Sequence, residues 1–410
     1  MISRSPNDAI SPPSHERWFI LAGVWLVYFC FGVVMVSLAP LVTPISKDLE
    51  ISNSTMGLIL GAWPLTYIIA AIPAGILLDR FGARSMLFLA AFIIAMSAVA
   101  RSLATTPEQM LLAVAMFGFG GPLISVGAPK VIAGLFEGPA RATAMGVYVT
   151  GPYIGGLIAL SLTNSVLMGL VDGNWRGVML IYAGFTFLGG LLWLLLSTIG
   201  DIKADTETGG KKFNLAAFAD LVRLRTVRLI LAMAIGIFFI NHALNNWLPE
   251  ILITRGLDAV AAGYWASIPA IVGIVGALVV PRLSIPEHRL LVMATLFVAT
   301  LLASLMLQGT PGPVMFLGLI LQGIARGSMM TVAILILMEA PSVPKERLGL
   351  AGGLFFTVAE VGGVLGPLSF GILSDFSGNF VLPLASITVV SVTLLLVLLA
   401  LRATPGAIAR

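Results

Sequence analysis

The chain contains 410 residues, of which 58% are hydrophobic and only 10% are charged. A soluble globular protein carries about 25% charged residues, so this sequence lacks the polar surface that a water-soluble enzyme or a disordered chain needs. A single cysteine, Cys30, excludes a disulfide framework and any cysteine-based metal site, and the three histidines are scattered. We therefore expect no bound metal and no cofactor.

Twelve apolar runs follow one another along the chain, each long enough to cross a lipid bilayer. A membrane-spanning helix needs about 20 residues to cross a hydrocarbon core of about 30 Å. The expected spans are 18–41, 55–78, 85–104, 108–136, 142–169, 176–199, 227–253, 260–281, 289–308, 313–338, 348–373 and 379–401. The sequence therefore predicts an all-α membrane protein with twelve transmembrane helices.

The basic residues predict the orientation of these spans. If the N-terminus is cytoplasmic, 17 of the 23 Lys and Arg residues fall in inner segments, four fall in outer segments, and Lys130 and Arg326 fall within spans. Basic loops stay on the cytoplasmic side, so we expect a multi-pass protein of the cell (inner) membrane with both termini in the cytoplasm. The net charge of +4 then reflects topology and contact with the lipid bilayer, and no nucleic-acid partner is expected.

The chain divides into two halves with weak internal similarity. The expected parts are a cytoplasmic tail at 1–17, a six-helix bundle at 18–199, a cytoplasmic linker at 200–226, a second six-helix bundle at 227–402, and a cytoplasmic tail at 403–410. The stretch from Phe213 to Arg228 has the pattern of an amphipathic helix at the membrane surface. The fifth and eleventh spans both open on an Arg followed five residues later by Gly, at Arg141 and Arg347. Such duplication is typical of transporters that rock two pseudo-symmetric bundles around a central site.

The loop after the second span carries a complete motif. It reads GILLDRFGAR from residue 75 to residue 84, which fits the pattern G-x-x-x-D-R-x-G-x-R. This motif resembles the loop 2–3 signature of the major facilitator superfamily, and the resemblance covers essentially the whole chain. It implies the major facilitator fold, alternating access, and a cytoplasmic charge latch made by Asp79, Arg80 and Arg84 with Glu137 and Arg141. The alternative interpretation is that Asp79 and Arg80 only cap a helix and follow the positive-inside rule.

Two further stretches resemble branches of this superfamily. The end of the seventh span, with Trp247 and Pro249, and the segment that follows it are similar to cyanate/2-nitroimidazole porters and, more loosely, to nitrate and organic-anion carriers. The fifth span reads GPYIGG from Gly151, which is similar to a motif of proton-coupled drug antiporters. Glycines also allow helices in lipid to pack closely, and this is the competing interpretation.

Two ionisable residues are expected deep inside the membrane, where each needs a partner or a water-filled space. Arg326 lies near the middle of the tenth span, and the resemblance implies that this span lines a central cavity. We expect Arg326 to bind a carboxylate or similar anion, with Gln322 one helical turn away on the same face. Glu360 lies at a similar depth in the eleventh span. It either neutralises Arg326 as a structural pair or carries a proton during transport.

Polar and aromatic side chains complete the expected site. The seventh span offers Asn241, His242 and Asn245 as substrate ligands, although Asn can equally join helices. Tyr28 and Tyr148 belong to aromatic groups that could stack on a flat solute or simply pack. Lys130 either extends toward the headgroups or gives the inner vestibule a positive potential.

These features predict a secondary active transporter and not an enzyme. The sequence contains no phosphate-binding loop and no H-E-x-x-H motif. The expected activity is proton-coupled uptake of a small organic anion or a flat polar metabolite by a monomer. The alternatives are uptake of a vitamin-like heterocycle and proton-driven efflux of a drug or metabolite.

Overall fold

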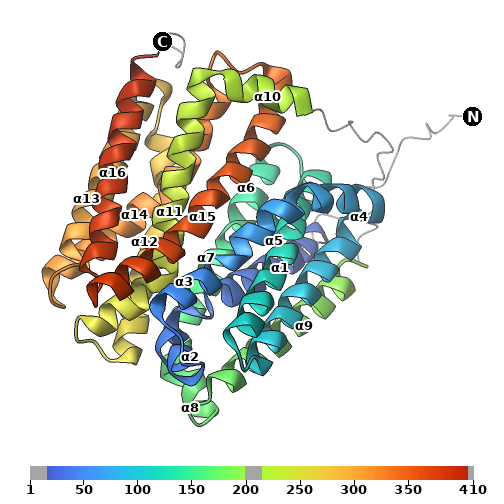
Figure 1. Ribbon diagram of the computed structural model, residues 1–410. Coiled ribbons are helices and arrows are strands. Elements are labelled where there is room, and N and C mark those ends of the chain that lie inside the picture. The colour runs from blue at the N-terminus through green and yellow to red at the C-terminus, as the bar shows by residue number, and fades with distance from the viewer. Residues whose placement is uncertain (1–15, 199–214, 405–410) are drawn as a thin grey trace, which may run out of the picture.

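The computed structural model describes residues 16–198 and 215–404 and contains only helices and their connections in these ranges (Figure 1). The first six spans consist of α1 (Glu16–Val36), η1 (Ala39–Leu41), α2 (Val42–Asp48), α3 (Asn53–Leu60), α4 (Ala62–Leu103), α5 (Pro107–Leu135), α6 (Gly138–Tyr148), α7 (Thr150–Leu162), the π-helical η2 (Thr163–Leu167), α8 (Met168–Leu170) and α9 (Trp175–Leu196). The chain continues through α10 (Leu215–Arg223), α11 (Arg225–Thr254), α12 (Ala259–Leu283), η3 (Pro286–His288), α13 (Arg289–Met306), α14 (Pro313–Met338), η4 (Lys345–Arg347), α15 (Leu348–Ser377) and α16 (Val381–Arg402). We call α1–α9 the N-bundle and α11–α16 the C-bundle.

Short helix α10 lies within the expected linker and ends before α11 begins at Arg225, so the seventh span starts two residues earlier than expected. The segment 199–214, most of the expected linker, lies outside the described residues, as do 1–15 and 405–410 of the two tails.

Eleven helical segments of the described chain are long and apolar enough to cross a membrane. The longest runs from Asn53 to Leu103 and has 51 residues, or about 76 Å at 1.5 Å per residue, more than twice the thickness of a hydrocarbon core. It is broken at Gly82, whose φ of 76° and ψ of 154° are not helical. The second and third expected spans therefore join at this glycine of the signature loop, and the prediction of twelve crossings is confirmed.

The two bundles repeat the same close packing between helices. In the N-bundle, Gly155 of α7 faces the α1 backbone so closely that a Cβ would overlap the carbonyl of Phe29. In the C-bundle, Gly366 of α15 faces the carbonyl of Phe239 on α11 in the same way. The packing of span five against span one is thus repeated by the packing of span eleven against span seven. The GPYIGG stretch packs against α1, as the packing interpretation expects.

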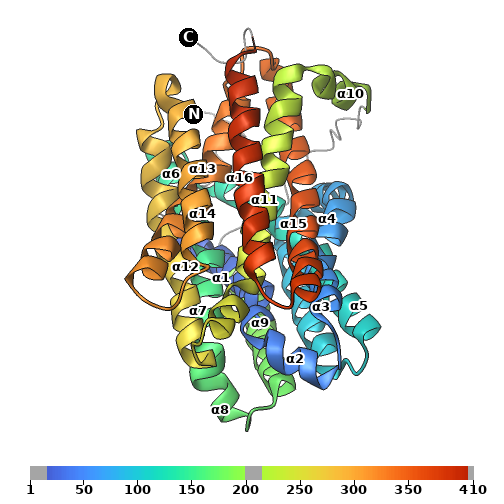
Figure 2. The same ribbon diagram turned by 60° about the vertical axis from the view of Figure 1, so that its left-hand side comes forward.

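Hydrogen bonds between the two bundles, among the described residues, gather at one end of the molecule, which also holds α2 and α8 in Figures 1 and 2. There Thr43 Oγ1 donates to Oε2 of Glu250 at 2.6 Å, and Asn164 Nδ2 donates to the Ala259 carbonyl at 3.3 Å. Glycine also brings the backbones together, because a Cβ on Gly57 of α3 would lie 2.5 Å from the Pro367 carbonyl of α15. We call this the closed end, and the end that holds α10 the opposite end.

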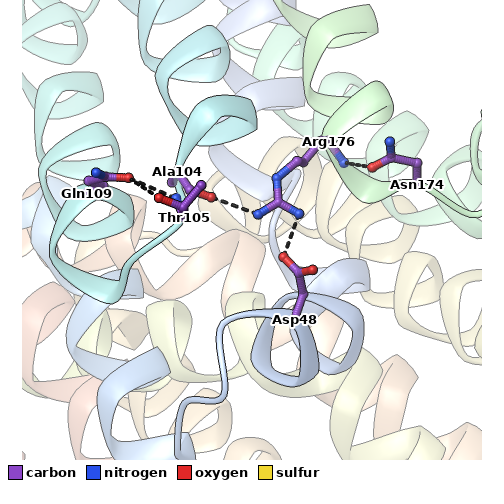
Figure 3. Close-up of polar contacts among 6 residues, drawn as sticks. All are labelled: Asp48, Ala104, Thr105, Gln109, Asn174 and Arg176. Carbon is purple, nitrogen blue, oxygen red and sulfur yellow. Dashed lines mark hydrogen bonds and ion pairs between the residues drawn. The ribbon is translucent and has the colours of Figure 1, made fainter.

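The loops of the N-bundle are tied together at the closed end by Arg176 (Figure 3). Its Nη1 donates to Oδ2 of Asp48 at 2.5 Å, and its Nη2 donates to the Ala104 carbonyl at 2.9 Å. The Asn174 side chain accepts from the Arg176 backbone N–H and caps α9. The Arg176 side chain thereby joins the ends of α2, α4 and α9 at the end where the N-bundle is bonded to the C-bundle.

Candidate functional site

Arg326 lies at the middle of α14, and its guanidinium Nη2 donates a hydrogen bond of 2.5 Å to Oδ1 of Asn245 on α11. No ion pair joins Arg326 to a carboxylate among the described residues. A neutral amide orients the guanidinium but leaves its charge uncancelled. A partly buried cation of this kind is a strong attractor for an anion, because its fork of N–H donors matches a carboxylate.

The expected pair between Arg326 and Glu360 is not formed, and this corrects the neutralising interpretation. Glu360 lies on α15 with only 6% of its surface exposed, and its titratable neighbour is His242 on α11. The two side chains approach to 3.7 Å between Nε2 and Oε2, which is close for an ion pair but too long for a hydrogen bond. Each of the two ionisable side chains instead contacts a residue of α11, Asn245 for Arg326 and His242 for Glu360.

Two amides near Arg326 have unused hydrogen-bonding capacity. Gln322 is 1% exposed, and both of its side-chain polar atoms lack a hydrogen-bond partner. Oδ1 of Asn241 is likewise buried without a partner. A buried polar atom without a partner costs about 1–3 kcal/mol, so a ligand that supplies hydroxyl or carboxylate groups here recovers that cost.

The N-bundle approaches this region with aromatic side chains. Trp63 of α4 lies against His242, with ring centroids 5.2 Å apart and planes tilted by 30°. Behind Trp63 lie Phe117 at 5.5 Å and Phe31 at 6.4 Å between centroids. Trp63 is therefore an aromatic contact between the N-bundle and an ionisable residue of the C-bundle.

Tyr28 and Tyr148, both expected at the site, stack on one another with centroids 5.6 Å apart. They belong to α1 and α6 of the N-bundle. The structure brings these two residues together, but each has its aromatic neighbours within its own bundle.

The residues of the expected charge latch and Lys130 lie at the opposite end. Lys130 Nζ donates to Oδ1 of Asp79 at 2.8 Å, so the cation expected at the vestibule pairs with the signature aspartate inside the N-bundle. Arg141 donates to the carbonyls of Phe136 and Ala133 at 2.7 and 2.9 Å and caps the end of α5. The remaining latch residues, Arg80, Arg84 and Glu137, have exposed side chains. In this conformation the expected partners therefore do not assemble into a latch between bundles.

An aspartate-to-helix contact between the bundles exists instead at the closed end. Asp375, near the end of α15, accepts hydrogen bonds from the backbone N–H groups of Asn53 and Ser54 at 3.1 and 2.7 Å and from the Ser54 hydroxyl. Ser374 accepts from Nδ2 of Asn53 at 2.8 Å. A carboxylate at a helix N-terminus is stabilised by free N–H groups and by the helix dipole. The sequence reasoning missed Asp375, although an acidic residue at the end of a span opposite a Ser-Asn-Ser-Thr helix start was a readable signal.

A buried cation was also missed. Arg101 of α4 is 1% exposed and donates to the Val34 carbonyl at 3.0 Å and to the Ser37 hydroxyl at 3.2 Å. Its guanidinium also lies over the Phe117 ring, 5.4 Å from the centroid. Because Arg101 lies near the end of a span, the sequence places it among the residues of an outer segment. In the structure it lies inside the bundle and binds the end of α1.

Two six-helix bundles, a midpoint cation and hydrogen bonds between the described parts of the bundles that gather at one end define a transporter of the alternating-access class. The chain belongs to the major facilitator superfamily: the sequence model described as Major Facilitator Superfamily matches residues 24–367. It is a multi-pass membrane transporter of small molecules and not an enzyme.

Similar proteins extend over most of the chain. The probable galactarate/D-glucarate transporter GudP of Escherichia coli strain K12 is 23% identical in an alignment that covers 88% of each chain. The D-galactonate transporter of Escherichia coli O6:H1 is 24% identical over 89% of this chain and 91% of its own. Among solved structures, a bacterial homologue of the human lysosomal transporter Spinster, in an inward-facing and unoccupied conformation, superposes with a TM-score of 0.77 at 19% identity, covering 97% and 99% of the two chains. This last likeness concerns the fold alone.

Proposed function

We propose that this protein imports a small hydroxylated organic anion together with protons. The observation that carries the proposal is the Arg326 guanidinium, which is held at mid-membrane by the neutral Asn245 and is paired with no described carboxylate. A substrate carboxylate supplies the missing counter-charge and binds both arms of the guanidinium fork.

Hydroxyl groups on the substrate suit the surroundings of Arg326. Gln322 lies one turn before Arg326 on α14, and Asn241 lies one turn before Asn245 on α11, so all four side chains belong to two facing helix surfaces. The amide atoms that lack partners at Gln322 and Asn241 would pair with substrate hydroxyls. The similar transporters are named for galactarate, glucarate and galactonate, which are hydroxylated carboxylates.

Proton coupling follows from the cost of importing an anion. Moving one negative charge into a cell with a negative interior costs about 2.3 kcal/mol for each 100 mV. Co-transport of protons cancels the charge and adds the energy of the pH gradient. Glu360, buried and unpaired with Arg326, is the candidate that takes the proton.

The proposed orientation places the opposite end in the cytoplasm of a cell whose inner membrane holds the monomeric protein. The support is the excess of basic residues in segments that belong to that end. The conformation with its closed end outward would then receive or release substrate on the cytoplasmic side.

The test uses purified protein in proteoliposomes, with radiolabelled D-galactonate and D-glucarate as probes and D-galactose as the uncharged control. We expect D-galactonate or D-glucarate to accumulate inside the proteoliposomes when the outer solution has the lower pH. R326Q should lose about 100-fold in affinity, which corresponds to about 3 kcal/mol for an unpaired buried carboxylate. R326K keeps the charge but lacks the two-armed guanidinium, so its affinity should lie between those of the wild type and R326Q.

The matched control is R282Q, which changes an exposed arginine at the end of α12 and should transport as the wild type does. Undiminished affinity in R326Q would remove Arg326 from the anion site. Export of either acid against the proton gradient would reverse the proposed direction.

A further inference from the structure

We propose that Glu360 and His242 form a single proton-binding site and that Trp63 of the N-bundle controls access to it. The proposal deepens the proposed function, since it gives proton coupling a location. The site itself is measurable without any substrate.

The first argument is the isolation of the Glu360 carboxylate. Its Oε2 atom is buried and has no hydrogen-bond partner, and Arg326, the cation expected to neutralise it, is bonded to Asn245. A lone buried carboxylate is costly, so Glu360 must either carry a proton or share one with a neighbour. His242 Nε2, at 3.7 Å, is the titratable atom in reach.

The second argument is the space that the chain leaves for this pair. Gly363 lies one turn after Glu360 on α15, and a Cβ there would lie 2.6 Å from Oε2 of Glu360 and 3.2 Å from Nδ1 of His242. The absence of a side chain at this position lets the carboxylate and the imidazole approach each other between α15 and α11.

The proton balance of the pair is simple. Without a proton, a carboxylate and a neutral imidazole carry a charge of −1 together. One bound proton makes the pair neutral, either as a carboxylic acid beside an imidazole or as a carboxylate beside an imidazolium. The other ionisable groups near this pair are Arg326 of α14, whose charge acts on His242, and the neutral Tyr67 of α4, which lies close enough to Glu360 to be affected by its charge.

The third argument concerns the cover. His242 lies between two aromatic rings, Phe238 of its own helix at 5.6 Å and Trp63 of the other bundle at 5.2 Å between centroids. Phe238 moves with the pair, whereas Trp63 moves with the N-bundle. A rocking motion that separates the bundles at this depth therefore lifts Trp63 from the imidazole and changes the access of water and protons to the pair.

The first experiment reads the proton directly through Trp63. A protonated imidazole in contact with an indole quenches its fluorescence more strongly than a neutral one. We would titrate the tryptophan emission of the full-length protein in nanodiscs between about pH 5 and 8, the range in which histidine ordinarily changes charge. The difference between wild type and W63F isolates the emission of Trp63 from that of the other tryptophans.

We expect this difference signal to titrate in the wild type and to be flat in H242Q. In E360Q the imidazolium loses its counter-ion, so quenching should need a lower pH. G363A, which keeps both titratable groups but displaces the carboxylate, should also move the midpoint. H288Q, which alters an exposed histidine at the opposite end, should leave the titration unchanged. A flat wild-type signal, or a titration that survives in H242Q, would overturn the site.

The second experiment tests the cover. In liposomes with an imposed pH gradient and a trapped pH dye, without substrate, W63A should dissipate the gradient several-fold faster than the wild type. W63F keeps a ring against His242 and should not. The leak should disappear in W63A/E360Q, and a leak of equal size in that double variant would refute control by Trp63.

The two proposals fail separately. A pH-dependent Trp63 emission without uptake of D-galactonate or D-glucarate would keep the proton site and reject the substrate class. Proton-driven uptake of either acid with a Trp63 emission that does not change with pH would keep the transport function and reject this site.

Discussion

The two ends of the molecule hold their charged residues in different ways. At the closed end, Asp375 of the C-bundle caps α3 of the N-bundle, and Glu250 accepts from Thr43 across the same boundary. At the opposite end, the ion pair of Asp79 with Lys130 stays within one bundle. Polar contacts of the described residues thus hold the bundles together at one end and leave them unconnected at the other.

This difference has a counterpart in the arrangement of the spans. Spans two and eleven run in opposite directions, so each ends beside the beginning of the other. Asp375 at the end of span eleven caps the start of span two, and by the same geometry we expect Asp79, at the end of span two, to cap the start of span eleven when the opposite end closes. A conformation that closes the opposite end would exchange one aspartate cap for the other.

The largest effect should come from adding a methyl group at the closed end. In G371A the new Cβ would overlap the backbone of Asn53, which cannot be relieved by a rotamer change. Overpacking of this kind costs about 1–3 kcal/mol, so the population should move away from the observed conformation by about 5- to 150-fold. Distances between spin labels at Glu108 and Thr310, exposed residues of the two bundles, would report the opening.

The control for this change lies in the same helix. Gly353 has no atom within 4 Å of the position of an added Cβ, so G353A should leave the label distances as they are in the wild type. An identical distance distribution in G371A would show that the α3–α15 contact does not limit opening.

A smaller opening is expected for D375A. This change removes the carboxylate that caps α3, and loss of a helix cap costs about 0.5–2 kcal/mol. Asp258 offers a matched control, because it caps α12 of its own bundle through the N–H groups of Val260 and Ala261 at 2.9 and 2.8 Å. D258A should therefore lower the stability of the folded protein without increasing the distance between the spin labels. Equal opening in both variants would contradict the role of Asp375 as the contact between bundles.

The Arg176 cluster should affect stability and not conformation, because all its partners lie in the N-bundle (Figure 3). Its partly exposed ion pair and carbonyl bond predict a loss of about 1 kcal/mol in R176Q. Thermal unfolding in detergent would measure this loss, and the label distances should not change. A shift in those distances would mean that the Arg176 cluster takes part in opening.

The smallest effect is expected for K130Q. The Lys130 and Asp79 side chains are 37% and 59% exposed, and such pairs contribute about 0–1 kcal/mol. Because the change frees Asp79 to cap α15, the population should move slightly toward closure of the opposite end. Spin labels at Arg84 and Arg282 would detect it, and movement in the other direction would refute the exchange of caps.

The sequence predicted the spans well and the side-chain partners poorly. Hydropathy located each crossing to within a few residues, because every membrane helix must bury about 20 apolar residues whatever its neighbours are. The glycines of span five were recognised as possible packing positions for the same local reason. The sequence left open whether Arg326 and Glu360 form a pair, because equal depth in two helices does not tell which way either side chain points.

Sequence alone thus determined that this chain crosses a membrane twelve times, belongs by its loop motif to a transporter superfamily, and carries an arginine, a histidine and a glutamate where lipid would reject them. Tertiary structure decided that Arg326 bonds to Asn245, that Glu360 faces His242 under Trp63, and that Asp375 closes the boundary between bundles. The physical reason is that burial of apolar residues is a property of each segment, whereas the rotation of a helix about its axis is fixed only by the helices packed around it.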